Sequence, residues 1–215
     1  MHFASLKRCN GTGSRTLPGK NVMLIQVISD IHGSVEDLRT AIDSFAVRKP
    51  DILLICGDFL NHGPRNDLPD GYDTKATAAL LNQYKDKIIC VRGNCDSEVD
   101  QMMLDFPCLN AYTNLFIPTA AGEKANGRIF VHHGHLYDRP QLQAWLSPGS
   151  LVVSGHTHVA LLEEENGLFY LNPGSLSIPK CADGKSCALI HSDSAGIRRI
   201  DLCSIGGKVL RTLSL

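Results

Sequence analysis

The sequence predicts an α/β protein in which two β-sheets pack face to face with helices on their outer sides. Two observations support this prediction. The first half of the chain alternates buried strands with helices, which is typical of a largely parallel sheet covered by helices. The second half carries short strands separated by turn signals, which is typical of a mostly antiparallel sheet. No internal repeat or linker is visible, so we expect one domain over residues 23–215.

In the first half, continuous apolar and β-branched runs indicate buried strands, and capping residues indicate where helices begin. Ser34 with Asp37, and Ser97 with Asp100, have the spacing of a capping box at a helix start. The expected strands are 22–29, 51–56 and 87–91, and the expected helices are about 35–47, 74–86 and 98–105.

In the second half, turn residues separate the strands. The Glu-Asn-Gly run at 165–167 is a hairpin signal, and Gly206 with Gly207 forms another turn. The expected strands are 114–119, 127–132, 151–155, 159–165, 168–172, 186–191, 197–203 and 208–213.

Composition places the chain among ordinary soluble globular proteins. Of its 215 residues, 43% are hydrophobic and 20% are charged, and the formal net charge is −1. Neither a basic domain nor a basic stripe with aromatic residues is present, which argues against nucleic acid as a partner. The chain has no apolar run of about 18 residues, so we expect no membrane-spanning helix.

Residues 1–22 show neither helix nor strand periodicity and lack the apolar middle of a signal peptide. Met23 stands directly before the first strong strand. We therefore expect Met23 to be the natural start and residues 1–22 to be a disordered or miscalled extension. Several of the eight cysteines lie in apolar runs, which indicates buried thiols rather than disulfide bonds. A cytoplasmic protein is expected on these grounds.

Polar residues of a few types follow five of the expected strands. Ligands bind beyond the carboxyl ends of strands in open α/β sheets, so we expect these residues to meet at one rim. The five strand ends supply two aspartates, one asparagine and several histidines. In the sequence they are Asp30 and His32, Asp58, Asn94, the run from His132 to His135, and His156 with His158.

Oxygen donors mixed with imidazoles suit manganese, iron, zinc and similar ions better than calcium. Seven ligands are too many for one tetrahedral ion, but two ions that share one carboxylate would use them all. Asp58 stands alone after its strand, as a bridging carboxylate would. Two ions roughly 3.5–4 Å apart can clamp an in-line displacement at phosphorus and activate a water molecule.

Together these motifs resemble the signature of the calcineurin-like metallophosphoesterase superfamily, over residues 23–215. The longer strings GDFLNHGPRN, VRGNCDSEVDQM and LNPGSLSIP are similar to the YfcE-type branch of small bacterial phosphodiesterases. The resemblance implies a four-layer α/β/β/α sandwich of two mixed sheets, in agreement with the strand pattern. The motifs stand here as SDIHG, CGDFLNHG, RGNCD, VHHGH and SGHTH.

The resemblance also implies how the ligands divide between two ions, with Asp58 as the bridge. His133 is chosen within its run because it directly precedes Gly134; His132 is expected to point into the core, and His135 to lie outside the ligand set. His156 and His158 would then serve different ions. One ion would take Asp30, His32 and His158, and the other Asn94, His133 and His156.

Three positions near these ligands are expected to act on the substrate. His62 stands where many relatives have an arginine that grips phosphate, and Arg65 follows closely enough to compensate. Cys95 stands where relatives have a histidine that protonates the leaving group, and a thiol is the poorer donor. His62 is then the best remaining proton donor or phosphate contact.

We therefore expect a phosphodiesterase that uses a hydroxide activated by two divalent ions and acts on a small phosphodiester. The resemblance favours manganese, with iron, zinc and nickel as alternatives. A phosphomonoesterase and a non-catalytic protein-binding scaffold on the same fold are the competing functions. The sequence leaves open whether the chain forms a homo-oligomer.

Overall fold

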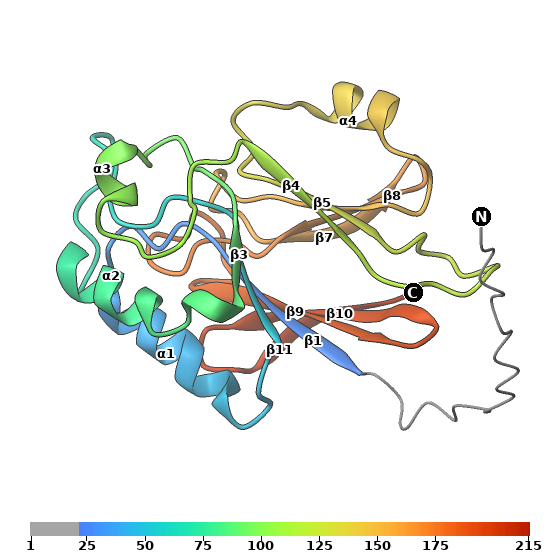
Figure 1. The fold of residues 1–215 in the computed structure, drawn as a ribbon, viewed down its shortest axis with the longest axis horizontal. Helices are drawn as coiled ribbons and strands as arrows, with labels where there is room; N and C mark the ends of the chain where they lie inside the picture. The colour runs from blue at the N-terminus through green and yellow to red at the C-terminus, as the bar shows by residue number, and fades with distance from the viewer. Residues whose placement is uncertain (1–21) are drawn as a thin grey trace, which may run out of the picture.

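The computed structural model describes residues 22–215; residues 1–21, which carry most of the expected N-terminal extension, lie outside the described residues. Two mixed sheets lie face to face, and helices cover the outer side of each, which confirms the four-layer arrangement (Figure 1). Within residues 22–215, no helix combines the length and the apolar character that a membrane crossing requires.

The first sheet combines the strands of the first half with those at the end of the chain. In spatial order they are β11 (Val209–Ser214), β10 (Gly196–Ser204), β9 (Ser186–Asp193), β1 (Met23–Ile28), β2 (Ile52–Ile55) and β3 (Ile88–Cys90). The strands β1, β2 and β3 are parallel, so their carboxyl ends share one edge. The three last strands are antiparallel additions that join through β9 to β1.

The second sheet contains the strands of the middle of the chain. In spatial order they are β4 (Tyr112–Phe116), β5 (Arg128–His132), β6 (Leu151–Val153), β8 (Leu168–Asn172) and β7 (Leu161–Glu165). Asn166 and Gly167 both have positive φ between β7 and β8, which confirms the hairpin turn expected there.

The helices are short. α1 (Val35–Ala46) begins at its expected cap Ser34, whose side chain accepts the N–H of Asp37. Helix α3 (Glu98–Gln101) keeps the expected capping box but ends early, because Leu104 and Phe106 turn back into the core. The remaining elements are α2 (Thr74–Asn82), the 3-10 turn η1 (Lys85–Lys87) and α4 (Arg139–Trp145).

The expectation that the second half forms one mostly antiparallel sheet is wrong in two respects, although most of its strand pairs are antiparallel. The strands β5, β6 and β8 pair in parallel, and only β4 and β7 at the edges are antiparallel. Parallel neighbours need a crossover connection, and between β5 and β6 the missed helix α4 lies in it. The last three strands, moreover, belong to the first sheet.

Alternation along the strands builds three layers of core. Ile25, Val27 and Leu54 face the second sheet and meet Val131 and Val153 there. The residues that alternate with them along each strand face outward. On the first sheet they pack against α1 and α2, and on the second sheet they pack against α4. The inner core therefore joins the two sheets directly, and the position of one sheet fixes the position of the other.

We predict that Leu54→Ala lowers the free energy of unfolding by about 2–5 kcal/mol, because Leu54 is fully buried between the sheets and its loss leaves a cavity. Urea denaturation followed by circular dichroism measures the change. Val47→Ala is the control, since Val47 is 91% exposed and should change stability by less than about 0.5 kcal/mol. Equal effects of the two substitutions would contradict this description of the core.

Candidate metal centre

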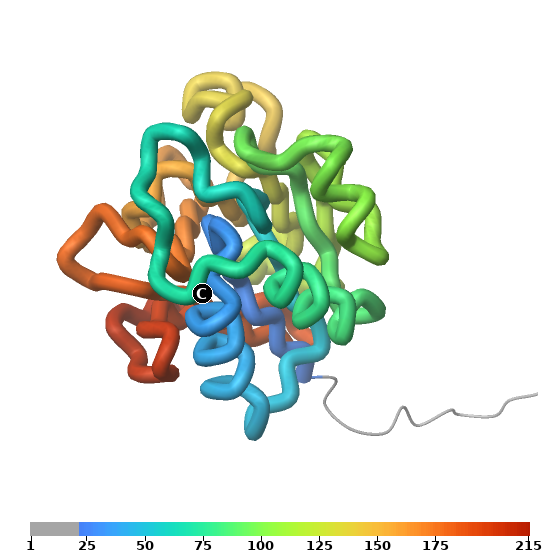
Figure 2. Tube along the Cα trace, turned by 90° about the vertical axis from the view of Figure 1, so that its left-hand side faces the viewer, coloured from blue at the N-terminus to red at the C-terminus, as the bar shows by residue number. Residues whose placement is uncertain are grey.

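The loops that follow β1, β2, β3, β5 and β6 meet at one end of the molecule. Figure 2 looks onto this end and shows loops from the blue, teal, green, yellow and orange parts of the chain gathered there. The first sheet contributes Asp30, His32, Asp58 and Asn94, and the second sheet contributes His133, His156 and His158. The expected rim is therefore present, and both sheets contribute to it.

Backbone strain is concentrated at these residues. Within residues 22–215, seven non-glycine residues have positive φ, and five of them are expected ligands. A left-handed conformation at a residue with a Cβ costs about 1–3 kcal/mol, so such positions mark sites that the surrounding structure holds in place. The five are Asp30, His32, Asp58, His156 and His158.

Two glycines let the loops approach one another. A Cβ at Gly93 would lie 2.0 Å from Asp58 Oδ1, and a Cβ at Gly155 would lie 1.9 Å from Ser29 Oγ. Neither position can hold a larger residue without moving a candidate ligand. The glycines in the Gly-Asn and Gly-His motifs are therefore required by packing beside the site.

Asp30, His32 and His158 form one compact group. The Nε2 atoms of the two histidines lie 3.2 Å apart, and Asp30 Oδ1 lies 3.2 Å from Nε2 of His158 and 3.8 Å from Nε2 of His32. All three side chains are buried. Their ligand atoms lie within 4.8 Å of one another, close enough to hold one ion.

Asp58, Asn94 and His133 form a second group beside the first. Nε2 of His133 lies 3.4 Å from Asp58 Oδ2 and 3.0 Å from Asn94 Oδ1. Asp58 Oδ2 also lies 3.7 Å from Nε2 of His32, in the first group. The carboxylate of Asp58 therefore lies between the two groups.

Three of the imidazoles are oriented in the same way by backbone carbonyls. Nδ1 of His32 donates to the carbonyl of Asn61 at 2.7 Å, and Nδ1 of His133 donates to that of Cys56 at 2.6 Å. Nδ1 of His158 donates to the carbonyl of Ile178 at 2.8 Å. These bonds fix the tautomer and direct each Nε2 toward the shared centre, as is usual for histidines that bind metals.

The charges in the site favour a bound cation. Burial would raise the pKa of the Asp58 carboxyl, but its hydrogen bond with His133 and the charge of that ring hold the pKa well below the usual range. Burial would lower the pKa of His133, but its hydrogen bond to Asp58 and the charge of Asp30 raise it to about 9. A positive charge at His133 is thus stabilised by two carboxylates, and a metal cation would be stabilised there in the same way.

An unpaired oxygen supports the same conclusion. Asp30 is fully buried; its Oδ2 accepts the backbone N–H of His156 at 3.0 Å, but its Oδ1 has no hydrogen-bond partner in the described residues. Leaving a buried carboxylate oxygen unpaired is costly. The donor set and this oxygen fit a divalent ion held by Asp30.

The remaining histidines lie around these groups. The ring centroid of His156 lies 5.1 Å from that of His133, and His135 lies beside both rings at 5.3 and 6.0 Å. His156 is in neither compact group, although it lines the cleft that opens beside them. His132 is buried on the opposite face of its strand, against Phe130 and Tyr137, as expected of a core residue.

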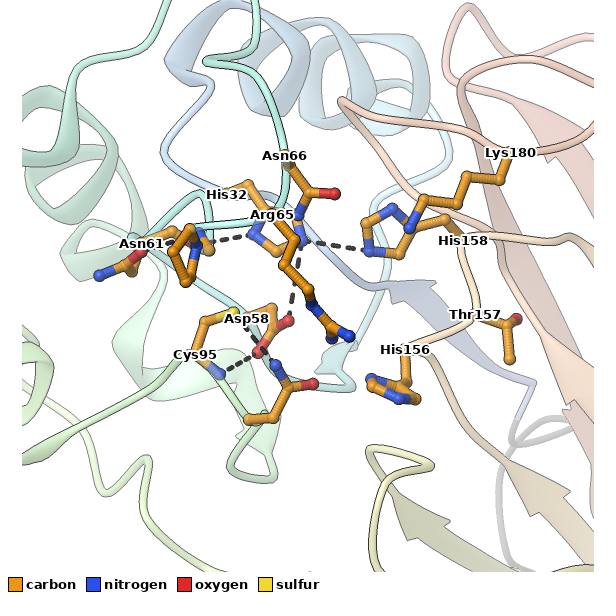
Figure 3. A pocket seen from close by; sticks show the side chains of 13 residues that line it. His32, Asp58, Asn61, Arg65, Asn66, Cys95, His156, Thr157, His158 and Lys180 are labelled. Carbon is orange, nitrogen blue, oxygen red and sulfur yellow. Dashed lines mark hydrogen bonds and ion pairs between the residues drawn. The ribbon is translucent and has the colours of Figure 1, made fainter.

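The cleft beside the two groups has a volume of about 730 Å³, and Figure 3 shows the side chains that line it. Arg65 and Cys95 line the cleft, but His62 does not; its ring packs edge-on against Tyr72. Lys180, which lies beside His158 in Figure 3, also lines the cleft and was missed by sequence reasoning. Its only signal is its place directly after the LNPGSLSIP string.

Asp96 is the last residue of the RGNCD motif, but its role was not predicted from the sequence. Its buried carboxylate accepts three backbone N–H groups, from Asp58 at 2.8 Å, Phe59 at 2.8 Å and Gly93 at 2.6 Å. These bonds join the loop after β2 to the loop after β3. Asp96 therefore holds in position the two segments that carry Asp58 and Asn94.

With this fold and site, the chain belongs to the calcineurin-like phosphoesterase superfamily, whose sequence model matches residues 23–195. It is 40% identical to the phosphodiesterase YfcE of Escherichia coli K12 over 188 residues, which are 87% of this chain and 98% of the relative. It is also similar to the solved structure of YfcE, a phosphoesterase from E. coli, with a TM-score of 0.80 at 36% identity, covering 89% and 99% of the two chains.

A more distant structure shares the fold alone. Vps29 of Entamoeba histolytica, solved in complex with zinc, matches with a TM-score of 0.57 at 21% identity and covers 89% of this chain and 99% of its own.

We predict that Asp96→Asn weakens the binding of a divalent ion, tested with manganese, by about 10- to 100-fold, the usual cost of losing a residue that orients metal ligands. An amide offers one acceptor oxygen in place of two and turns its own N–H groups toward backbone donors. Calorimetric titration of the metal-free protein measures the affinity. Asp105→Asn, a substitution at an exposed position, is the matched control. Unchanged affinity in Asp96→Asn would show that the hydrogen bonds to Asp96 do not position the metal ligands.

Proposed function

We propose that this chain is a metal-dependent phosphodiesterase that holds two divalent ions. The observation that carries the proposal is the position of Asp58, whose Oδ2 lies 3.7 Å from Nε2 of His32 and 3.4 Å from Nε2 of His133. One carboxylate between two groups of ligands is the arrangement that a shared, bridging ligand requires. The relative with 40% identity is a phosphodiesterase, which supports the same function.

In this proposal the two ions share Asp58 and divide the other ligands between them. When bound, they supply positive charge that polarises the phosphoryl oxygen and activates water for in-line attack. Manganese is the proposed metal, because the oxygen and imidazole donors suit it and the resemblance favours it. One ion is assigned Asp30, His32 and His158, and the other Asn94, His133 and His156.

Two cationic side chains of the cleft would bind the substrate. Arg65 extends toward the space between Asp58 and His156 in Figure 3, and Lys180 lies on the side of His158. Neither makes an ion pair with any residue in the range 22–215. Their charges are therefore available to an anionic substrate, and Arg65 can take the place of the arginine that is absent at position 62.

The cleft favours a diester over a monoester. A diester carries one negative charge, whereas a monoester carries up to two. Both cations of this cleft are exposed and bind an anion weakly, and this weakness costs the diester less binding energy than it costs the monoester. Burial raises the pKa of the Cys95 thiol to about 12, and the charge of Asp58 acts in the same direction. The thiol is therefore a weak proton donor to a departing alkoxide. A proton-donor role for His62 stays a prediction, with its ring against Tyr72.

A non-catalytic scaffold is the competing function from another class. The likeness to Vps29 concerns the fold and says nothing of this function. Each expected ligand position holds a competent donor here, and the orphaned oxygen of Asp30 and the unpaired cations of the cleft are unexplained in a scaffold. Cytoplasmic location and the question of a homo-oligomer stay predictions from the sequence.

We predict that Asp58→Asn reduces the bound manganese from two ions to about one and lowers turnover of bis(p-nitrophenyl) phosphate by more than about 100-fold. Residues that only orient ligands already contribute about 10- to 100-fold, and a shared ligand contributes more. Metal analysis by mass spectrometry and a colorimetric assay measure the two effects. Asp67→Asn, in the exposed loop nearby, should change neither. Wild-type protein that binds the metal but shows no turnover would favour the scaffold.

We also predict a steep dependence of the rate on the leaving group. This enzyme lacks a strong general acid. It should therefore hydrolyse diesters with poor leaving groups roughly 10²–10⁴-fold more slowly than an otherwise similar enzyme that has an imidazolium donor. A series of methyl aryl phosphates with phenols of rising pKa measures the slope. A flat plot with chemistry rate-limiting would show that an efficient proton donor exists in the site.

A further inference from the structure

A second hollow lies on the outer face of the second sheet, beside α4 and behind the loops that carry His133 and His156. Its volume is about 450 Å³, within the range of small-molecule sites. Side chains from the ends of β5, β6 and β8 line it together with Tyr137, Arg139 and Leu142 from the segment around α4. None of its lining residues is among the candidate metal ligands.

Two buried polar groups of this hollow have no partner. Tyr170 is 4% exposed and His132 is 3% exposed, and both line the hollow. The hydroxyl of Tyr170 and Nδ1 of His132 make no hydrogen bond to any residue that the structure describes. A buried polar group without a partner is destabilising, so these two atoms leave hydrogen-bonding capacity that no described residue uses.

Aromatic surfaces surround these groups. The ring of Tyr137 lies 5.7 Å from that of His132, and the guanidinium of Arg139 lies 4.5 Å over the ring of Tyr170. Flat, aromatic walls with hydrogen-bonding groups between them suit a planar heterocycle, which can stack and pair at its edge. A saturated hydrocarbon chain would leave these hydrogen-bonding groups unused.

The hollow adjoins the metal cleft at Thr157, an exposed residue that lines both. The Nδ2 group of Asn172 donates to Thr157 Oγ1 at 3.1 Å and to the carbonyl of Gly155 at 2.7 Å, which fixes this shared rim. A phosphodiester bound at the metal cleft can therefore extend one ester group over Thr157 into the hollow. The residues that line the cleft itself include no phenylalanine, tyrosine or tryptophan, and its three imidazoles are candidate metal ligands.

We propose that this hollow binds the planar, hydrogen-bonding heterocycle of a nucleoside ester, so that the substrates are phosphodiesters in which at least one ester group is a nucleoside. The inference rests on the proposed phosphodiesterase function and names its substrate class. Tyr170 and His132 recognise the edge of the heterocycle, and Tyr137 packs against its face. The metal cleft holds the phosphate.

Binding in the hollow can be measured without metal or catalysis. Trp145 is the single tryptophan of the chain, and its ring lies 5.5 Å from that of Tyr137. We expect thymidine, but not ribose, to change Trp145 fluorescence saturably in metal-free protein. Tyr170→Phe should weaken thymidine binding about 5-fold, the effect of one neutral hydrogen bond, while Tyr84→Phe, distant from the hollow, should not.

The melting temperature of Tyr170→Phe shows whether a loss of thymidine binding comes from the lost hydroxyl or from poor folding. Because the Tyr170 hydroxyl is unpaired in the free protein, Tyr170→Phe is expected not to lower the melting temperature. A lower melting temperature, an absence of saturable change with thymidine, or equal thymidine affinity in Tyr170→Phe and wild type would each overturn the inference.

Two p-nitrophenyl esters then test the link to substrate choice. Thymidine 5′-(p-nitrophenyl phosphate) and methyl p-nitrophenyl phosphate have the same leaving group and differ only in the second ester. We expect the manganese-loaded wild type to favour the thymidine ester by at least about 10-fold in kcat/KM, and Tyr170→Phe to reduce that ratio about 5-fold.

The outcomes separate the two proposals. Equal kcat/KM for both esters would overturn the nucleoside inference and leave the phosphodiesterase function standing. No turnover of either ester would overturn the proposed function, and thymidine binding to the metal-free protein would show that the hollow itself was described correctly.

Discussion

The hydrogen bonds to Asp96 are the interaction on which the site depends. One buried carboxylate accepts backbone N–H groups from the loops after β2 and β3, at 2.6–2.8 Å. Burial raises the pKa of this carboxyl to about 7 and the charge of Asp58 acts in the same direction, whereas the three backbone N–H groups lower the pKa and so favour the charged acceptor. Asp58 is held at a φ of 56° beside this carboxylate. The strained backbone that aims the bridging ligand is thus stabilised by a residue that lies outside the ligand set.

The sequence predicted the fold well wherever local patterns decide it. The strands that precede the ligands are continuous apolar runs, and the caps Ser34 and Ser97 lie where expected. The pairing of strands was harder to foresee, because periodicity shows which face of a strand is buried and does not show its neighbour. Helix α4 was missed because its seven residues make only about two turns, too short a run for the helical periodicity to stand out, although Asp138 and Gln141 form a capping box at its start.

For the site, the residue types and their place after strands were sufficient to predict the gathering of all seven candidates at one rim. Their division between two ions could not be derived from spacing and came from the family resemblance. Lys180 and Asp96 were missed for a different reason. The first lies outside the quoted motifs. The second ends the RGNCD motif but acts through backbone N–H groups, and a sequence does not show which backbone groups a carboxylate contacts.

The two sheets hold different halves of the candidate centre. Asp30, Asp58 and Asn94 follow strands of the first sheet, whereas His133 and His156 follow strands of the second. No single loop therefore determines the separation of the two sets of ligand atoms; the thickness of the apolar layer between the sheets does. Any slip of one sheet over the other would change that separation directly. The side chains of the inner core touch no substrate, but they determine how far apart the two sets of ligand atoms lie.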